Sequence, residues 1–256
     1  MLDENILVVI PAYNESDRLP PFLGKIKDFF LDQPQVSYSY RILVVDDGSS
    51  DNMVEKIKQI QQDWAELEVL RLPENRGKGA AVRTGVLQSK EDMILVCDAD
   101  GATPIEEIKK LLPLIDADAD IVCGSRLLQN AKVKRSFLRS LSGKLFACLV
   151  RKLAGLSVSD SQCGFKLMKG DCARKLFRIS TEDRYAYDIE ILSLAECLRY
   201  TIKENGICWH EVSGSKVNLI HDGLKMIRDT YRIRSAVSQK IALASVKQKD
   251  IVTYYN

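Results

Sequence analysis

Short, mostly apolar runs recur along the first half of the chain, and each is followed by polar or turn-forming residues. They cover residues 6–10, 41–45, 67–71, 93–97 and 119–123. Runs that stay apolar at consecutive positions are typical of strands that are buried on both faces of a parallel sheet. The pattern therefore predicts five strands.

Between these runs, apolar residues recur at helical spacing over residues 20–31, 52–64, 79–88 and 104–115. The last segment carries helix-start signals, with Thr103 as the expected N-cap, Pro104 in the first turn and Glu106 completing a capping box. Alternating strands and helices predict an α/β fold with a doubly wound, mostly parallel sheet. In such sheets, ligands bind beyond the carboxyl ends of the strands.

The second half of the chain has longer helical patterns and fewer apolar runs. We expect helices over residues 136–153 and 188–200, a turn over 160–165 that leads into a short strand, a short strand over 206–210, and a charged helix from residue 222. No linker or internal repeat separates these segments. We therefore predict one domain over residues 1–220, followed by a C-terminal helix and polar tail over residues 221–256.

The composition is that of an ordinary globular protein, with 46% hydrophobic and 28% charged residues in 256 and a formal net charge of +2. The distribution of charge is more informative. Residues 121–159 contain no Asp or Glu but eight basic residues: Arg126, Lys132, Lys134, Arg135, Arg139, Lys144, Arg151 and Lys152. Such a basic block indicates an anionic ligand or surface. We expect no nucleic-acid partner.

The seven cysteines are scattered, and no pair has the spacing of a zinc site. Those in apolar runs are predicted to be small core residues, which fits a reducing compartment: Cys97, Cys123, Cys148 and Cys208. The sequence shows no secretory signal peptide and no apolar run near the roughly 20 residues that cross a bilayer. We expect a protein that is cytoplasmic or faces the cytoplasm.

Asp98 and Asp100 follow the fourth apolar run directly. Two carboxylates one residue apart at the end of a strand can hold Mg²⁺ or Mn²⁺, which take oxygen ligands and often share them with substrate phosphates. The alternative is that these residues only end a strand and cap a turn.

Polar clusters also follow the other predicted strands. Asp46 and Asp47 are suited to a nucleobase or ribose, or else they form a tight turn. Residues 75–79 combine cations with glycines that let backbone N–H groups approach a ligand, or the glycines simply start a helix. Because the strand ends meet at one edge of the sheet, their agreement favours a binding site over chance.

These motifs resemble, in order and spacing, those of family 2 glycosyltransferases. They are Pro11-Ala12-Tyr13-Asn14-Glu15, Val45-Asp46-Asp47-Gly48-Ser49, Asn75-Arg76-Gly77-Lys78-Gly79, Asp98-Ala99-Asp100-Gly101 and Gly124-Ser125-Arg126. The motifs at residues 162–166, 184–190 and 209–216 are similar to those of dolichyl-phosphate β-glucosyltransferases. Eukaryotic members of that group usually begin with a transmembrane helix, which this sequence lacks, so the lipid can be another polyprenyl phosphate.

The resemblance implies a GT-A (Rossmann-like) fold and inverting transfer of glucose from UDP-glucose to a polyprenyl phosphate of the dolichyl type, with Mg²⁺ or Mn²⁺. Three alternatives stay open. They are a GDP-mannose-dependent mannosyltransferase, a transferase to a saccharide, and a catalytically silent module that binds nucleotide sugar or anionic lipid. Asp46 and Asp47 suit uracil and guanine equally, so the base stays open too.

The resemblance also implies roles for individual residues. Asp100 is expected to ligate the metal, with Asp98 at the second metal position or on the ribose. Arg126 is assigned to the acceptor phosphate, because its planar fork binds oxyanions. Asp188 is expected to position the sugar hydroxyls, unless it is a helix N-cap. The expected substrate-binding residues are Pro11, Tyr13, Glu15, Asp46, Asp47, Lys78, Arg83, Asp98, Ala99, Arg135, Arg139, Gln162, Glu190 and Lys216. Among them, Arg135, Arg139 and Lys216 are candidates for the acceptor phosphate by location and charge.

Two further expectations concern the surface. The basic, apolar segment from Arg135 to Leu153 lies either in the membrane interface or on the sheet, since its charges interrupt its apolar arc. His210 and His221 have no triad partners in the sequence and are expected to be structural or surface residues.

Overall fold

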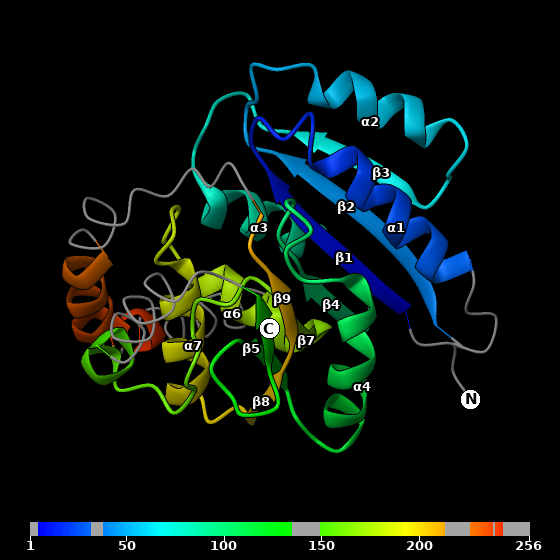
Figure 1. Ribbon diagram of the computed structural model, residues 1–256. Helices are drawn as coiled ribbons and strands as arrows, with labels where there is room; N and C mark the ends of the chain where they lie inside the picture. Colours follow the sequence, from blue (N-terminus) through cyan, green and yellow to red (C-terminus); the bar gives the residue numbers. More distant parts are fainter. Residues whose placement is uncertain (1–4, 32–37, 135–148, 213–225, 238, 243–256) are drawn as a thin grey trace, which may run out of the picture.

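The computed structural model describes residues 5–31, 38–134, 149–212, 226–237 and 239–242 (Figure 1). A seven-stranded sheet of order β3-β2-β1-β4-β7-β5-β8 forms its centre. The strands are β1 (Asn5–Ala12), β2 (Ser39–Asp46), β3 (Leu67–Arg71), β4 (Met93–Val96), β5 (Ile121–Ser125), β7 (Lys166–Lys169) and β8 (Ile202–Gly206). The five strands predicted from apolar runs are all present, with ends that differ by a few residues.

The sheet is mostly parallel, as predicted, but β7 is antiparallel to both of its neighbours, β4 and β5. Val96 at the end of β4 is paired with Lys166 at the start of β7. This strand direction brings the residues before β7 to the same edge as the residues after β4. It therefore adds a segment from the second half of the chain to the carboxyl edge of the sheet.

Helices cover both faces of the sheet (Figure 1). They are α1 (Leu19–Leu31), α2 (Met53–Gln61), α3 (Lys78–Leu87), α4 (Ile108–Asp116), α6 (Gly170–Ile179) and α7 (Tyr187–Cys197). Val8 packs in a core with residues of α1, α2 and α4, whereas Val9 packs in the opposite core with residues of α3, α6 and α7. Because successive strand residues point to opposite faces, two apolar layers require the continuous apolar runs seen in the sequence.

Several local predictions differ from the structure. Thr103 is not an N-cap, because a 3-10 turn over Ile105–Glu107, preceded by Pro104, comes before α4. The strand expected over residues 206–210 corresponds to the short β9 (Cys208–His210), which pairs with β6 (Lys132–Lys134); only its first residue, Gly206, belongs to the edge strand β8. Strands β6 and β8 were not predicted, because a short strand and an edge strand carry few apolar positions. Helix α6 was not predicted either, although Cys172, Leu176 and Phe177 are buried on one of its faces.

Of the helix expected over residues 136–153, only the end at 149–154 lies in the described part, and it is helical. Residues 226–237 and 239–242 are helical, in agreement with the charged helix expected from residue 222. Ile233 and Val237 are buried in the same core as α7. The C-terminal helix therefore packs on the main body, and a domain boundary near residue 220 stays a prediction.

The cysteines of the described residues are all free. Cys97 and Cys123 are buried, as predicted, whereas Cys208 is partly exposed and Cys148 lies outside the described residues. Among the helices that the structure describes, none is both long and apolar enough to span a bilayer.

Candidate active site

Charged side chains gather where β2, β4 and β5 end and where β7 begins. Asp46 ends β2, Asp98 lies two residues after β4, and Arg126 follows β5. The antiparallel β7 brings Gly164 to Asp98 so closely that a Cβ at this glycine would overlap the Asp98 carboxylate. Glycine is needed at position 164 for this close approach.

Asp98 forms an ion pair with Lys78 at the start of α3. Burial opposes ionisation of this carboxyl, but the nearby positive charges, led by Lys78, hold the pKa of Asp98 below its usual range. Asp98 is thus a carboxylate at neutral pH, and one of its oxygens is already used by a lysine.

Asp100 has the opposite environment. Burial and the negative charge of Asp98 raise the pKa of Asp100, although its Oδ1 accepts a hydrogen bond of 3.0 Å from the Ala102 amide. The turn after Asp100 needs Gly101, whose φ is +67°. Two carboxylates one residue apart therefore differ in charge environment, and Asp100 is the one that a nearby cation would stabilise most.

These two carboxylates fit a hard divalent cation. Within the described residues, no cluster of three or more His, Cys, Asp or Glu side chains is placed to hold a metal ion. A cation at Asp98 and Asp100 would thus take its remaining ligands from water and phosphate oxygens, as Mg²⁺ commonly does. One oxygen of each carboxylate already has a protein partner, but the partner of Asp98 is the cation Lys78, whereas that of Asp100 is the neutral Ala102 amide, so Asp100 could serve as the principal ligand.

Arg126 is held in place by Asp160. Its Nε and Nη2 each donate a hydrogen bond of 2.8 Å to the Asp160 carboxylate, and its backbone amide donates a third of 2.9 Å. The guanidinium also lies 5.8 Å from the Trp209 ring centre. Asp160 was not predicted as a site residue, although it begins the turn over residues 160–165. These contacts fix the Arg126 guanidinium at the carboxyl edge of the sheet, with a quarter of the Arg126 side chain exposed.

Asp188 is buried and paired with Lys166. Lys166 Nζ lies 2.5 Å from Asp188 Oδ1 and also contacts the Cys163 carbonyl, and both side chains are at most 5% exposed. The alternative that Asp188 is a helix N-cap is wrong, since Ala186 occupies that position in α7. Lys166 was not singled out from the sequence, although a lysine that opens a buried strand was a usable signal.

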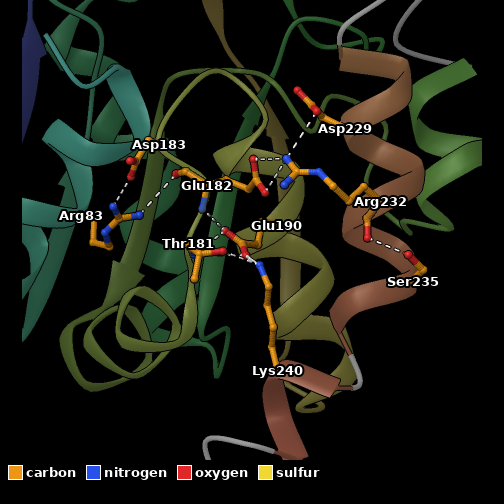
Figure 2. Close-up of polar contacts among 9 residues, drawn as sticks. All are labelled: Arg83, Thr181, Glu182, Asp183, Glu190, Asp229, Arg232, Ser235 and Lys240. Atoms are coloured by element: carbon orange, nitrogen blue, oxygen red, sulfur yellow. Dashed lines mark hydrogen bonds and ion pairs between the residues drawn. The ribbon is translucent and has the colours of Figure 1, made fainter.

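The structure does not bring Glu190 to the site, contrary to the substrate-binding role expected for it. Glu190 is fully buried, and its carboxylate accepts hydrogen bonds from the amides of Thr181 and Glu182 (Figure 2). Positions two apart on a helix are rotated by about 200°, so Asp188 and Glu190 point in nearly opposite directions. The expected pair of carboxylates is therefore split between two environments.

Gly77, the N-cap of α3, and Gly79, in its first turn, lie at the start of this helix and make room for protein rather than for a ligand. A Cβ at Gly77 or Gly79 would collide with backbone atoms of residues 182–184. The amides of Arg76 and Gly77 donate to the Asp47 carboxylate, both at 2.8 Å. Burial raises the pKa of Asp47 despite these bonds. Asp47, expected on the nucleotide, thus orders the loop that carries Lys78.

The remaining charged residues of the first two motifs, Glu15 and Asp46, are each paired with an arginine of the protein. Asp46 is fully buried, with Oδ1 accepting from the Ser49 amide and Oδ2 lying 3.3 Å from Arg71 Nε. Glu15 lies 2.5 Å from Arg18. Pro11 is buried in β1, whereas Tyr13 follows β1 and is 37% exposed.

The other expected site residues are distributed as follows. Ala99 is 5% exposed and its side chain packs in the core with residues of α1 and α4. Arg83 pairs with Asp183 and Gln162 contacts Met226 of the C-terminal helix, so each faces a protein partner. His210 is exposed, as expected of a surface residue. The expectations for Arg135, Arg139, Lys216 and His221 fall outside the described residues.

Comparison with known proteins adds the following. The family model described as "Glycosyl transferase family 2" matches residues 7–177. The chain is 37% identical over 238 residues to the dolichyl-phosphate beta-glucosyltransferase of Dictyostelium discoideum, covering 89% of this chain and 73% of that protein. It is 39% identical over 239 residues to the protein of the same name from Drosophila melanogaster, covering 88% of this chain and 73% of that protein.

A solved structure with a similar fold is glucosyl-3-phosphoglycerate synthase from Mycobacterium tuberculosis, crystallised with Mn²⁺, UDP-glucose and phosphoglyceric acid. Its TM-score is 0.63 at 18% identity, over 91% of this chain and 80% of that chain. Mannosyl-3-phosphoglycerate synthase from Rubrobacter xylanophilus has a TM-score of 0.60 at 18% identity, over 97% of this chain and 76% of that chain. These likenesses support the mostly parallel α/β sheet expected from the sequence.

Proposed function

Because this chain belongs to glycosyl transferase family 2, we propose that it transfers glucose from UDP-glucose to a polyprenyl phosphate and inverts the anomeric carbon. One observation carries this proposal. The family model ends at residue 177, but the similarity to dolichyl-phosphate beta-glucosyltransferases extends over 89% of the chain. The match thus goes beyond the region that family members with other acceptors share.

On the donor side, Asp100 and Asp98 would hold Mg²⁺ or Mn²⁺ together with the diphosphate of the nucleotide sugar. The cation supplies Lewis-acid stabilisation of the departing diphosphate. Lys78, whose pKa is raised well above its usual value because the charges of Asp98 and its neighbours outweigh burial, keeps a positive charge at the same place. It balances the Asp98 carboxylate and orients it through their ion pair.

On the acceptor side, Arg126 offers a fixed cation for a phosphate, because Asp160 and Trp209 hold the guanidinium. The second pKa of a phosphate monoester is about 6, so the acceptor is mostly dianionic at neutral pH and needs no strong base. Asp188, the carboxylate that would serve as a base for a hydroxyl acceptor, is tied to Lys166 at 2.5 Å. This pairing favours a phosphate acceptor over a saccharide hydroxyl.

We also propose peripheral association with a membrane surface, where a polyprenyl phosphate resides. The helical residues 149–154 bury Val150 and Ala154 but expose Leu149, Arg151 and Lys152. An apolar and basic outer face suits an interface with anionic lipid. Sedimentation with vesicles that contain phosphatidylserine should carry down the wild type and much less of an Arg151→Glu/Lys152→Glu variant. Equal sedimentation of both proteins would contradict this surface.

The activity is tested with labelled UDP-glucose, Mn²⁺ or Mg²⁺, and a short polyprenyl phosphate, followed by extraction of the lipid product. We expect glucose on the lipid in a β linkage, which NMR of the product identifies. The unphosphorylated polyprenol is the matched control acceptor and should give no product. Transfer only from GDP-mannose would replace the donor assignment, and binding without transfer from either donor would identify a silent module.

A further inference from the structure

Residues 181–184, called the strap below, lie between α3 and the C-terminal helix (Figure 2). Its inner side touches the first turn of α3. The Ala80 amide donates a hydrogen bond of 3.0 Å to the Asp183 carbonyl, and Arg83 pairs with the Asp183 carboxylate. Glycines at positions 77 and 79 permit this contact, because any side chain there would collide with the strap.

The outer side of the strap is held by two cations of the C-terminal helix. Arg232 Nη2 lies 2.9 Å from the Glu182 carboxylate. Lys240 Nζ donates a hydrogen bond of 2.6 Å to the Thr181 hydroxyl and also pairs with the buried Glu190. The Glu190 carboxylate in turn accepts hydrogen bonds from the backbone amides of Thr181 and Glu182. It therefore joins the strap, α7 and the C-terminal helix (Figure 2).

The first turn of α3 carries Lys78, which pairs with Asp98 of the proposed donor site. A continuous set of polar contacts therefore runs from Lys240 through Glu190 and the strap to this turn. We infer that Glu190 and Lys240 are positioning residues for donor binding, acting through the strap and Lys78 and not by contact with the substrate. The inference deepens the proposed function and rests on its assignment of a UDP-sugar donor.

The charge pattern supports a positioning role. Glu190 is fully buried, and removing Lys240 would leave its negative charge without that cation in the interior, a costly arrangement. The strap would then relax away from Glu190 more readily than the packed helices around it, because it is a loop held by polar contacts. Its contact with the Ala80 amide would weaken at the same time, and so would the placement of Lys78.

The test compares Lys240→Met with two matched variants. Lys240→Arg keeps the charge at the same place, and Arg228→Met removes a cation from an exposed position of the same helix. The dissociation constant of UDP is measured with Mn²⁺ by titration calorimetry, and hydrogen exchange is followed at residues 77–82. Thermal unfolding verifies that each variant is folded.

We expect Lys240→Met to raise the dissociation constant of UDP on the order of fivefold, a typical effect of a residue that acts through others. Exchange at residues 77–82 should accelerate in the same variant. Lys240→Arg should recover most of the affinity, and Arg228→Met should bind as the wild type does. Wild-type affinity and unchanged exchange in a folded Lys240→Met protein would overturn the inference. Absence of UDP binding by the wild type would overturn the donor assignment itself, and with it the strap's role in donor binding.

Discussion

Lys166 and Asp188 form a buried ion pair at 2.5 Å that joins the start of β7 to the first turn of α7. Burial opposes the charge on Lys166, but the carboxylate of Asp188 outweighs it and raises the pKa of Lys166. Lys166 thus keeps its positive charge at neutral pH in the interior, beside the Asp188 carboxylate. The pair fixes the antiparallel strand that brings Gly164 against Asp98.

Removing one member of this pair should destabilise the protein strongly. Lys166→Met leaves Asp188 as an uncompensated buried charge, so we expect the free energy of unfolding to fall by about 3–5 kcal/mol. The double variant Lys166→Met/Asp188→Leu removes both charges and should recover much of that loss. Urea denaturation gives the free energy of unfolding of the wild type, the single variant and the double variant.

The control for this experiment is Lys25→Met, which removes an exposed lysine from α1. Its free energy of unfolding should stay within about 0.5 kcal/mol of the wild type. If Lys166→Met were as stable as Lys25→Met, the buried pair would not have the role given to it here.

The parts of the fold that follow from sequence are those with a local signal. The runs at residues 6–10 and 41–45 became β1 and β2 because two apolar faces require consecutive apolar residues. The Asp98–Asp100 motif was placed correctly at the end of β4 for the same reason. The resemblance to family 2 glycosyltransferases is confirmed by the family match.

What could not be predicted depends on contacts between distant segments. The four residues of β7 show no periodicity that reveals an antiparallel insertion, so Lys166 and Asp160 were not recognised as parts of the site. The helix expected from residue 188 already separates the directions of Asp188 and Glu190, but the contacts that bury Glu190 come from the amides of Thr181 and Glu182, which carry no sequence signal. For the glycines at positions 77 and 79 the sequence left open a ligand contact or the start of a helix. Their contact with the strap was not foreseen, because the strap comes from a segment a hundred residues further along.

The pair of Arg126 and Asp160 should make stability depend on acid pH. Burial opposes ionisation of Asp160, but the guanidinium and backbone amide of Arg126 outweigh it and hold the pKa of Asp160 below its usual range. A carboxylate with a lower pKa in the folded state adds stability above its unfolded pKa of about 3.9. That stability is lost as the pH falls through the folded pKa.

We therefore expect Asp160→Asn to lower the free energy of unfolding at pH 7 by about 3 kcal/mol, because Arg126 loses its buried partner. The gap between variant and wild type should begin to narrow as the pH falls below about 4, the unfolded pKa, and should close as the pH passes the lower folded pKa, where the wild-type carboxyl becomes protonated too. Urea unfolding from pH 7 to pH 3 follows this gap. Asp171→Asn, at a fully exposed carboxylate, is the control and should show little effect at any pH. A gap that does not change with pH would argue against the ion pair as its origin.

Asp100 should be needed for metal-dependent donor binding. Asp100→Asn keeps the size of the side chain and an oxygen for the Ala102 amide, but it removes the negative charge that a divalent cation requires. We expect turnover to fall by at least about a thousandfold, comparable to the loss of a principal electrostatic contact in other enzymes. Calorimetry should show that Mn²⁺ strengthens UDP binding by the wild type and not by the variant. Full activity of Asp100→Asn, or equal Mn²⁺ dependence, would remove Asp100 from the metal site.

Gly164 offers a test of the geometry that is independent of charge. A Cβ at this position would overlap the Asp98 carboxylate, so Gly164→Ala must displace either that carboxylate or the turn before β7. Because Asp98 is also tied to Lys78, we expect the displacement to cost about tenfold or more in kcat/KM, in line with the effect of small misplacements in active sites.

Gly24→Ala is the matched control for this change. A Cβ at Gly24 meets no atom within 4 Å, and alanine in the middle of α1 should raise the free energy of unfolding by about 0.5–1 kcal/mol. Its activity should equal that of the wild type. Steady-state kinetics and urea unfolding of both variants separate a local displacement from a loss of fold. A Gly164→Ala protein with wild-type kcat/KM would show that the close approach of β7 to Asp98 does not set the geometry of the site.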